Sequence, residues 1–179
     1  MLAVDVDPVA SLKIWSVDVI TPVGTFKIPP LPANMWLIAI YESWGSFERI
    51  IDLLKYDDRT RLEDAVLEGR LEEGQLYVAV TEAITVAAGR PWWQAINLLD
   101  LLRGDWSRLH GKTLKGFDPA RFSLAAYLDR AYSAVIELTD EKSRQKVDGF
   151  IETPSPGMKI ELNEAQEGET FLAMLNSSR

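Results

Sequence analysis

Three closely spaced prolines, Pro29, Pro30 and Pro32, separate two parts of the chain that have different hydrophobic periods. Before them, polar and apolar residues alternate in LKIWSVDVI, and a PVG tripeptide precedes a second short run, TFKIP. Alternation with a period of two is typical of half-buried strands, so residues 12–29 are predicted to form a two-stranded hairpin. The prolines end its second strand and begin an extended connector, because each ring removes a hydrogen-bond donor and restricts the preceding residue.

After the prolines, apolar residues recur at spacings of three and four, which indicates successive short helices. Asn34 is predicted to cap the first, over MWLIAIYES, and Ser46 the second, over FERIIDLLK. Asp57 and Asp58 open a third helix, because carboxylates are favoured near a helix N-terminus. Residues 72–89 have the β-branched content of a strand, but their length and terminal glycine favour a helix, and a helix is predicted.

The segment GRPWWQAINLLDLLRGDW, residues 89–106, holds three of the six tryptophans. Pro91 suits a first helical turn, and the polar residues that follow it are spaced by three. On an α-helix such a stripe drifts by about 60° per step, so we predict a helix, ending at Gly104, that is buried over most of its circumference. Consecutive residues point about 100° apart, so Trp92 and Trp93 cannot fill one pocket. One is expected in the core, and the other packs on a different neighbour or is available to a partner.

The remaining chain is predicted to continue in helices and to end in a tail. Asp105 is expected to cap WSRLHGKTLKG, and Asp118 to start a long helix that ends near Leu138. An apolar stripe runs along this long helix at spacings of four and three: Leu124, Leu128, Ala131, Val135 and Leu138. A polar helix, TDEKSRQKVDGFIE, follows, and the prolines of ETPSPG end the packed part.

The fold class is therefore mainly α: an N-terminal β-hairpin followed by a bundle of about six to eight short helices and a loosely attached acidic C-terminal tail. The predicted divisions are a hairpin arm over residues 1–30, a helical domain over 31–157 and the tail over 158–179. A lone hairpin is marginal in water, so it must pack on the helices or on a neighbouring molecule.

The composition argues against several kinds of chemistry. The chain has no cysteine and a single histidine, His110, which excludes disulfides and argues against a zinc site. No phosphate-binding glycine motif and no serine nucleophile turn is present, and the abundant carboxylates alternate with arginines as on exposed helices. We therefore expect a protein that is not an enzyme and that binds no cofactor or metal.

Charge and hydropathy limit the classes of partner that the chain is expected to bind. The formal net charge of −8 opposes nucleic-acid binding, and the cations between Arg103 and Arg121 are interpreted as a solvated face. No apolar run approaches the roughly 20 residues that span a bilayer, and the N-terminus has no signal-peptide pattern. We expect neither nucleic acid nor membrane as a partner, and a cytoplasmic protein. Proteins of this kind use surplus aromatic side chains in cores or as anchors at protein interfaces.

Several segments, taken in order, resemble the tail assembly chaperones of siphophages that infect actinobacteria. They are the hairpin followed by IPPLPANMWLIAI, then GRPWWQAINLLDLLRGDW, FDPARFSLAAYLDRAYSAVIEL and DEKSRQKVDGFIETPSPG. The similarity extends over residues 14–157, and the motifs RPWW (90–93) and YLDRAY (127–132) contribute most of it. The acidic tail contributes none.

This resemblance implies a protein that binds the long, helical, apolar tape measure protein before tail-tube subunits polymerise around it, in the cytoplasm of the infected host. Tail-tube subunits and a second copy of the chain are further candidate partners. In this family a ribosomal frameshift near the end of the gene yields an elongated product. Apolar helix faces meeting in a groove suit such a partner. The predicted partner-binding residues are Trp36, Trp92, Trp93, Leu124, Leu128 and Tyr132.

Two other classes of function remain open at this point. The first is a structural component of the virion, such as a head-to-tail connector, which would remain in the purified particle. The second is a phage protein that binds a host factor, which would be recovered with that factor. A chaperone would be absent from the mature particle.

Overall fold

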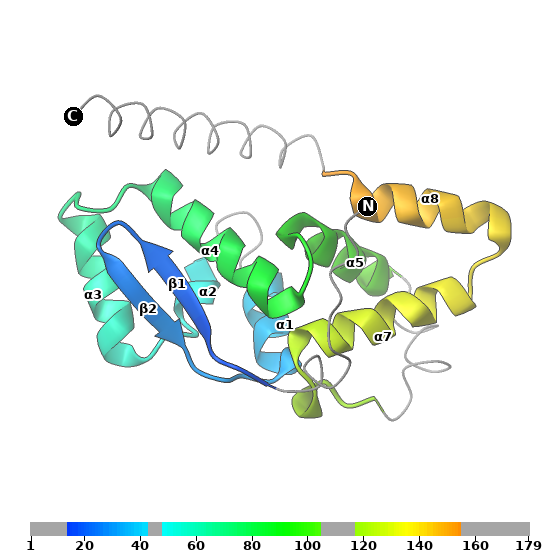
Figure 1. The fold of residues 1–179 in the computed structure, drawn as a ribbon, viewed down its shortest axis with the longest axis horizontal. Coiled ribbons are helices and arrows are strands. Elements are labelled where there is room, and N and C mark those ends of the chain that lie inside the picture. Colours follow the sequence, from blue (N-terminus) through cyan, green and yellow to red (C-terminus); the bar gives the residue numbers. More distant parts are fainter. Residues whose placement is uncertain (1–13, 43–47, 105–116, 155–179) are drawn as a thin grey trace.

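The computed structural model describes residues 14–42, 48–104 and 117–154 (Figure 1). These residues form an N-terminal antiparallel hairpin and, within the described ranges, seven α-helices and a short 3-10 helix. The mainly helical fold with an N-terminal hairpin is confirmed. The hairpin, α3 and α4 lie at one end of the molecule, and α7 and α8 lie at the other (Figure 1). The predicted helix after Asp105 and the tail over residues 158–179 lie outside the described residues.

The hairpin consists of β1 (Val17–Thr21) and β2 (Gly24–Ile28), with Val19 opposite Phe26. The alternation predicted from the sequence is present, because one face is buried and the other carries exposed side chains such as Ile20. The buried face belongs to the same apolar core as the helices, and the hairpin packs on α3 and α4. Residues 17–28 therefore share one apolar core with the helices.

The next helices are α1 (Ala33–Glu42), α2 (Glu48–Ile51) and α3 (Tyr56–Leu67). The predicted cap at Asn34 is wrong, because α1 begins one residue earlier and the Ala33 N–H donates to the carbonyl of Phe122 (2.8 Å). Ser46 lies outside the described residues. Asp57 and Asp58 lie in the first turn of α3, as predicted.

Helix α4 (Glu73–Ala88) resolves the ambiguity of residues 72–89 in favour of a helix. Glu72 and Gln75 form a capping box in which each side chain accepts a hydrogen bond from the other residue's backbone N–H. Gly89 ends the helix in a left-handed conformation (φ 63°), which glycine adopts without a steric penalty. The two end signals outweigh the strand propensity of the β-branched residues between them.

Helix α5 (Trp92–Gly104) lies among the other helices and contacts α4, α7 and α8. From Trp92 to Arg103 only Arg103 is exposed, so the prediction of a helix buried over most of its circumference is confirmed. The carbonyl of Pro91 accepts hydrogen bonds from the N–H groups of the first turn. Helix α5 also ends at Gly104, as predicted.

The C-terminal helices are α7 (Leu124–Glu137) and α8 (Glu141–Glu152). Asp118 does not start the long helix, because it caps a separate 3-10 turn, η2 (Pro119–Arg121). The side chain of Ser123 accepts from the N–H of Ala126 and begins α7 instead. The polar helix predicted from TDEKSRQKVDGFIE is α8, which Asp140 caps.

Tyr41 connects α1 to α5, and its hydrogen bond is expected to make the free energy of unfolding depend on alkaline pH. Its hydroxyl donates to the carbonyl of Leu99 (3.0 Å), and burial raises its pKa to about 12 from the usual 10. Because the pKa is higher in the folded state than in the unfolded state, the protonated Tyr41 hydroxyl contributes fully to the free energy of unfolding below pH 10. This contribution is lost as the pH rises through 12. The difference in unfolding free energy between the unchanged chain and Tyr41→Phe should therefore shrink between pH 10 and 12. Urea unfolding at several pH values measures it, and a constant difference would contradict the assignment.

Candidate partner-binding surface

The adjacent tryptophans occupy different environments. Trp92 is 4% exposed, and its ring makes edge-to-face contacts with Tyr77 (ring centroids 6.0 Å apart) and with Trp93 (6.2 Å). Its backbone N–H donates to the hydroxyl of Thr85 on α4 (3.1 Å). Trp93 is only partly buried. Trp92 is thus the core residue of the pair, and Trp93 is the less completely buried one.

Three more predicted partner contacts lie in the core. Trp36 is 2% exposed, Leu124 1% and Leu128 0%. Together with Trp92, these side chains cannot touch a partner while the helices stay packed. The apolar stripe of α7 faces α1, α4 and α5 and fills the core, which places Leu124 and Leu128 there.

Tyr132, the sixth predicted residue, is partly buried and connects α7 to α8. Its hydroxyl donates to a carboxylate oxygen of Asp148 (2.8 Å). Burial is the main reason that its pKa is raised, and the hydrogen bond to Asp148 adds to this effect, while the positive charge of Arg90 opposes it. Of the predicted residues, Trp93 and Tyr132 therefore remain accessible, and Tyr132 lies where α7 meets α8.

An ion pair connects the two motifs that contribute most to the family resemblance. The guanidinium of Arg90, in RPWW, binds the carboxylate of Asp129, in YLDRAY. The Arg90 side chain is 16% exposed and that of Asp129 is 62% exposed. The two motifs thus form one structural unit, although about forty residues separate them. The sequence contained both charges but no signal that they pair.

The unequal burial of this pair predicts unequal effects of its two substitutions. Asp129→Ala leaves a mostly buried cation without its carboxylate and should lower the free energy of unfolding by about 1–2 kcal/mol. Arg90→Met keeps the apolar stem of the side chain and leaves an exposed carboxylate in water, so its effect should be smaller. Chemical denaturation of both variants tests this, and a larger loss for Arg90→Met would contradict the assignment.

Asn97 has a structural role that the sequence did not indicate. It lies on α5, is 4% exposed, and its side-chain amide donates to carbonyls at the C-terminal end of α8. The three acceptors are Phe150 (3.0 Å), Ile151 (3.3 Å) and Thr153 (3.1 Å). Helix ends leave their last carbonyls without intrahelical donors, so Asn97 caps α8 from another helix. In the sequence, Asn97 was only one of the polar residues spaced by three.

Large apolar side chains are exposed on several elements. They are 41–84% exposed and comprise Ile20, Met35, Ile38, Tyr56, Leu67, Val86 and Phe150. The sequence predictions missed them, although the alternation in β1 places Ile20 on the same face as Asp18. Single exposed apolar residues are ordinary at protein surfaces, and only a continuous patch indicates binding.

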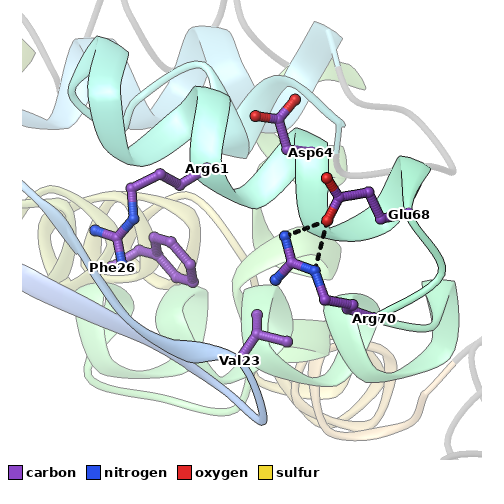
Figure 2. A pocket seen from close by; sticks show the side chains of 6 residues that line it. All are labelled: Val23, Phe26, Arg61, Asp64, Glu68 and Arg70. Carbon is purple, nitrogen blue, oxygen red and sulfur yellow. Dashed lines mark hydrogen bonds and ion pairs between the residues drawn. The ribbon is translucent and has the colours of Figure 1, made fainter.

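A small hollow lies between the hairpin and α3 (Figure 2). Its volume is about 150 Å³, and it is lined by Val23, Phe26, Arg61, Asp64, Glu68 and Arg70. The guanidinium of Arg61 lies over the Phe26 ring (5.3 Å), and Arg70 pairs with Glu68 (2.6 Å). Two cations and two carboxylates balance one another here, and none of the predicted partner-binding residues lines it.

No helix in the described ranges combines the length and apolar character needed to cross a bilayer. Among the residues that the structure covers, no three histidine or carboxylate side chains are grouped so that they could hold a metal ion. Comparisons with protein-family models, curated proteins and solved structures give no match to this chain.

Proposed function

We propose that this chain is a tail assembly chaperone of an actinobacterial siphophage and that it binds the tape measure protein. It keeps that protein in solution in the host cytoplasm until tail-tube subunits polymerise around it. The role is one of binding, without catalysis or a cofactor. The observation that carries the proposal is the order of the segments from the hairpin to ETPSPG, with RPWW and YLDRAY as their most specific motifs.

Two features of the molecule support the proposal. The ion pair between Arg90 and Asp129 joins the two motifs, so the residues of the resemblance belong to one packed unit. The chain is also acidic, with a net charge of −8, and it exposes apolar side chains on several elements. Net charge keeps a complex in solution while apolar contacts hold an aggregation-prone helix.

Co-expression tests the proposal directly. The proposed partner is the product of the very long reading frame expected just downstream of this gene. It is expressed with the intact chain, or with this gene interrupted by an early stop codon. We expect the long protein to become soluble and to co-purify only with the intact chain. Crosslinking and mass spectrometry of the complex would then locate the contacts.

Two experimental outcomes would contradict the chaperone proposal and favour another function. A chain that is abundant in mature virions and leaves the solubility of the tape measure protein unchanged would be a structural component such as a connector. A chain recovered from infected cells with one host protein, and not with the tape measure protein, would act on the host.

A further inference from the structure

Helix α8 is held to the body of the protein by few apolar contacts. Ile151 is its one buried side chain, and Val147 is partly buried against the core. The other described attachments are polar: the carbonyls bound by Asn97, and Asp148 bound by Tyr132. Most of the cohesion of a domain comes from apolar burial, so a helix attached in this way opens at a lower free energy than α5 or α7.

The middle of α8 is also weak as a helix. Gly149 lies inside it, and glycine is among the poorest helix formers because of its backbone freedom. A 12-residue helix is marginal in water when it is isolated. Once separated from α5, α8 is therefore expected to lose its helical structure.

Two buried donors at the start of α5 have unused hydrogen-bonding capacity. Trp93 and Asn97 are four residues apart, so they share one face of α5, and Asn97 contacts α8 directly. The indole N–H of Trp93 and the Nε–H of Arg90 are buried and have no acceptor within the described residues. Buried donors are normally paired, so these two would gain from a new acceptor.

We propose that α8 is a removable cover over a helix-binding surface formed by α5 and α7, and that an amphipathic helix of the tape measure protein replaces it there. The contacts of α8 define the chemistry of the incoming helix. It carries two apolar residues four apart, as Val147 and Ile151 are, and a carboxylate in the position of Asp148. Its last carbonyls bind Asn97, and further acceptors bind Trp93 and Arg90. The identity of the partner as the tape measure protein rests on the proposed function. The existence of the covered surface rests only on the contacts of α8.

A cover of this kind reduces apparent affinity by the fraction of molecules in which it is open. Substitutions within α8 change that fraction and leave the surface on α5 and α7 intact. Gly149→Ala stabilises the closed helix, and an added Cβ at this position meets no atom within 4 Å. Ile151→Ala removes the buried anchor of α8. Gly74→Ala is the matched control, because Gly74 is a helical glycine of α4 with equally open space.

Two probes are titrated with the full-length chain and its three variants: a labelled peptide of residues 139–154, and the tape measure protein. Gly149→Ala should weaken binding about fivefold, which corresponds to the propensity difference between glycine and alanine. Ile151→Ala should strengthen binding about tenfold or more, as expected for loss of a buried aliphatic anchor. Gly74→Ala should bind like the unchanged chain.

The two probes separate failure of this inference from failure of the proposed function. If the peptide follows the expected order but the tape measure protein does not bind, the covered surface stands and the chaperone function fails. If the tape measure protein binds all four chains equally, the chaperone function stands and the cover is overturned. Absence of peptide binding to Ile151→Ala would also overturn it. If Ile151→Ala folds poorly, the comparison of Gly149→Ala with Gly74→Ala still tests the cover, because equal binding by these two variants would overturn it.

Discussion

Replacing Trp92 with alanine is expected to lower the free energy of unfolding by about 3–5 kcal/mol, the usual range for truncating a fully packed tryptophan. Trp92 is 4% exposed and lies between Tyr77 and Trp93, so its removal leaves a cavity that the rigid helices cannot close. Chemical denaturation followed by circular dichroism measures the loss.

Trp93→Ala is the matched control, because it removes the same side chain one residue further along the helix. Trp93 is partly buried, so its loss should be smaller, about 1–2 kcal/mol for the area it covers. If Trp93 lies on the covered surface as proposed, the same variant should bind the tape measure protein more weakly. Equal losses of stability for the two variants would contradict the assignment of Trp92 to the core.

Asn97→Asp is expected to detach α8 at neutral pH. The substitution places a carboxylate against three carbonyl oxygens at the negative end of a helix, where an amide donor lay before. Loss of a buried donor together with this repulsion should lower the free energy of unfolding by about 2–3 kcal/mol. The loss cannot exceed the free energy with which α8 is attached, because α8 detaches at that point. Hydrogen exchange should show loss of protection over residues 141–152, with α5 and α7 still protected.

The pH dependence of this variant gives a second readout. The same carbonyls raise the pKa of the new carboxyl in the folded state, so its penalty is absent below the unfolded pKa of about 4 and grows as the pH rises. Protection of α8 in Asn97→Asp should therefore recover at acid pH relative to Asn97→Ala, which has no such group. Identical exchange in the two variants across this pH range would show that the amide of Asn97 does not cap α8.

Local patterns predicted much of the fold because the physics that selects each element acts within a few residues. The alternation before Pro29 is enough to specify a strand, and the drifting polar stripe of α5 is enough to specify burial on nearly every side. In α4, the length of the segment and the glycine at its end identified the helix despite its β-branched content. These features need no knowledge of what packs against them.

The errors arose where two local signals competed or where a distant residue decided the outcome. Asp118 and Ser123 are both good helix caps, and the chain uses both, one for a 3-10 turn and one for α7. Asn34 lost its predicted role because α1 begins at Ala33, whose N–H reaches the carbonyl of Phe122 nearly ninety residues away. No local pattern contains that acceptor.

The candidate site was less predictable than the fold. Aromatic and apolar residues at helical spacing are equally suited to a core and to an interface, and the sequence does not state which faces of two helices meet. Four of the six predicted partner residues proved to be core, while the capping amide of Asn97 and the pair formed by Arg90 and Asp129 were not foreseen. Such contacts join residues that are far apart in the chain.

The sequence by itself determined the type of each principal element, the change of period at Pro29, and the fact that Trp92 and Trp93 face different ways. Helical and strand periods follow from the local geometry of the backbone. Only the tertiary structure decided which tryptophan is enclosed and which helix is held mainly by polar contacts. Those outcomes depend on how α4, α7 and α8 surround α5, because burial is a property of the packed assembly of helices and not of any one segment.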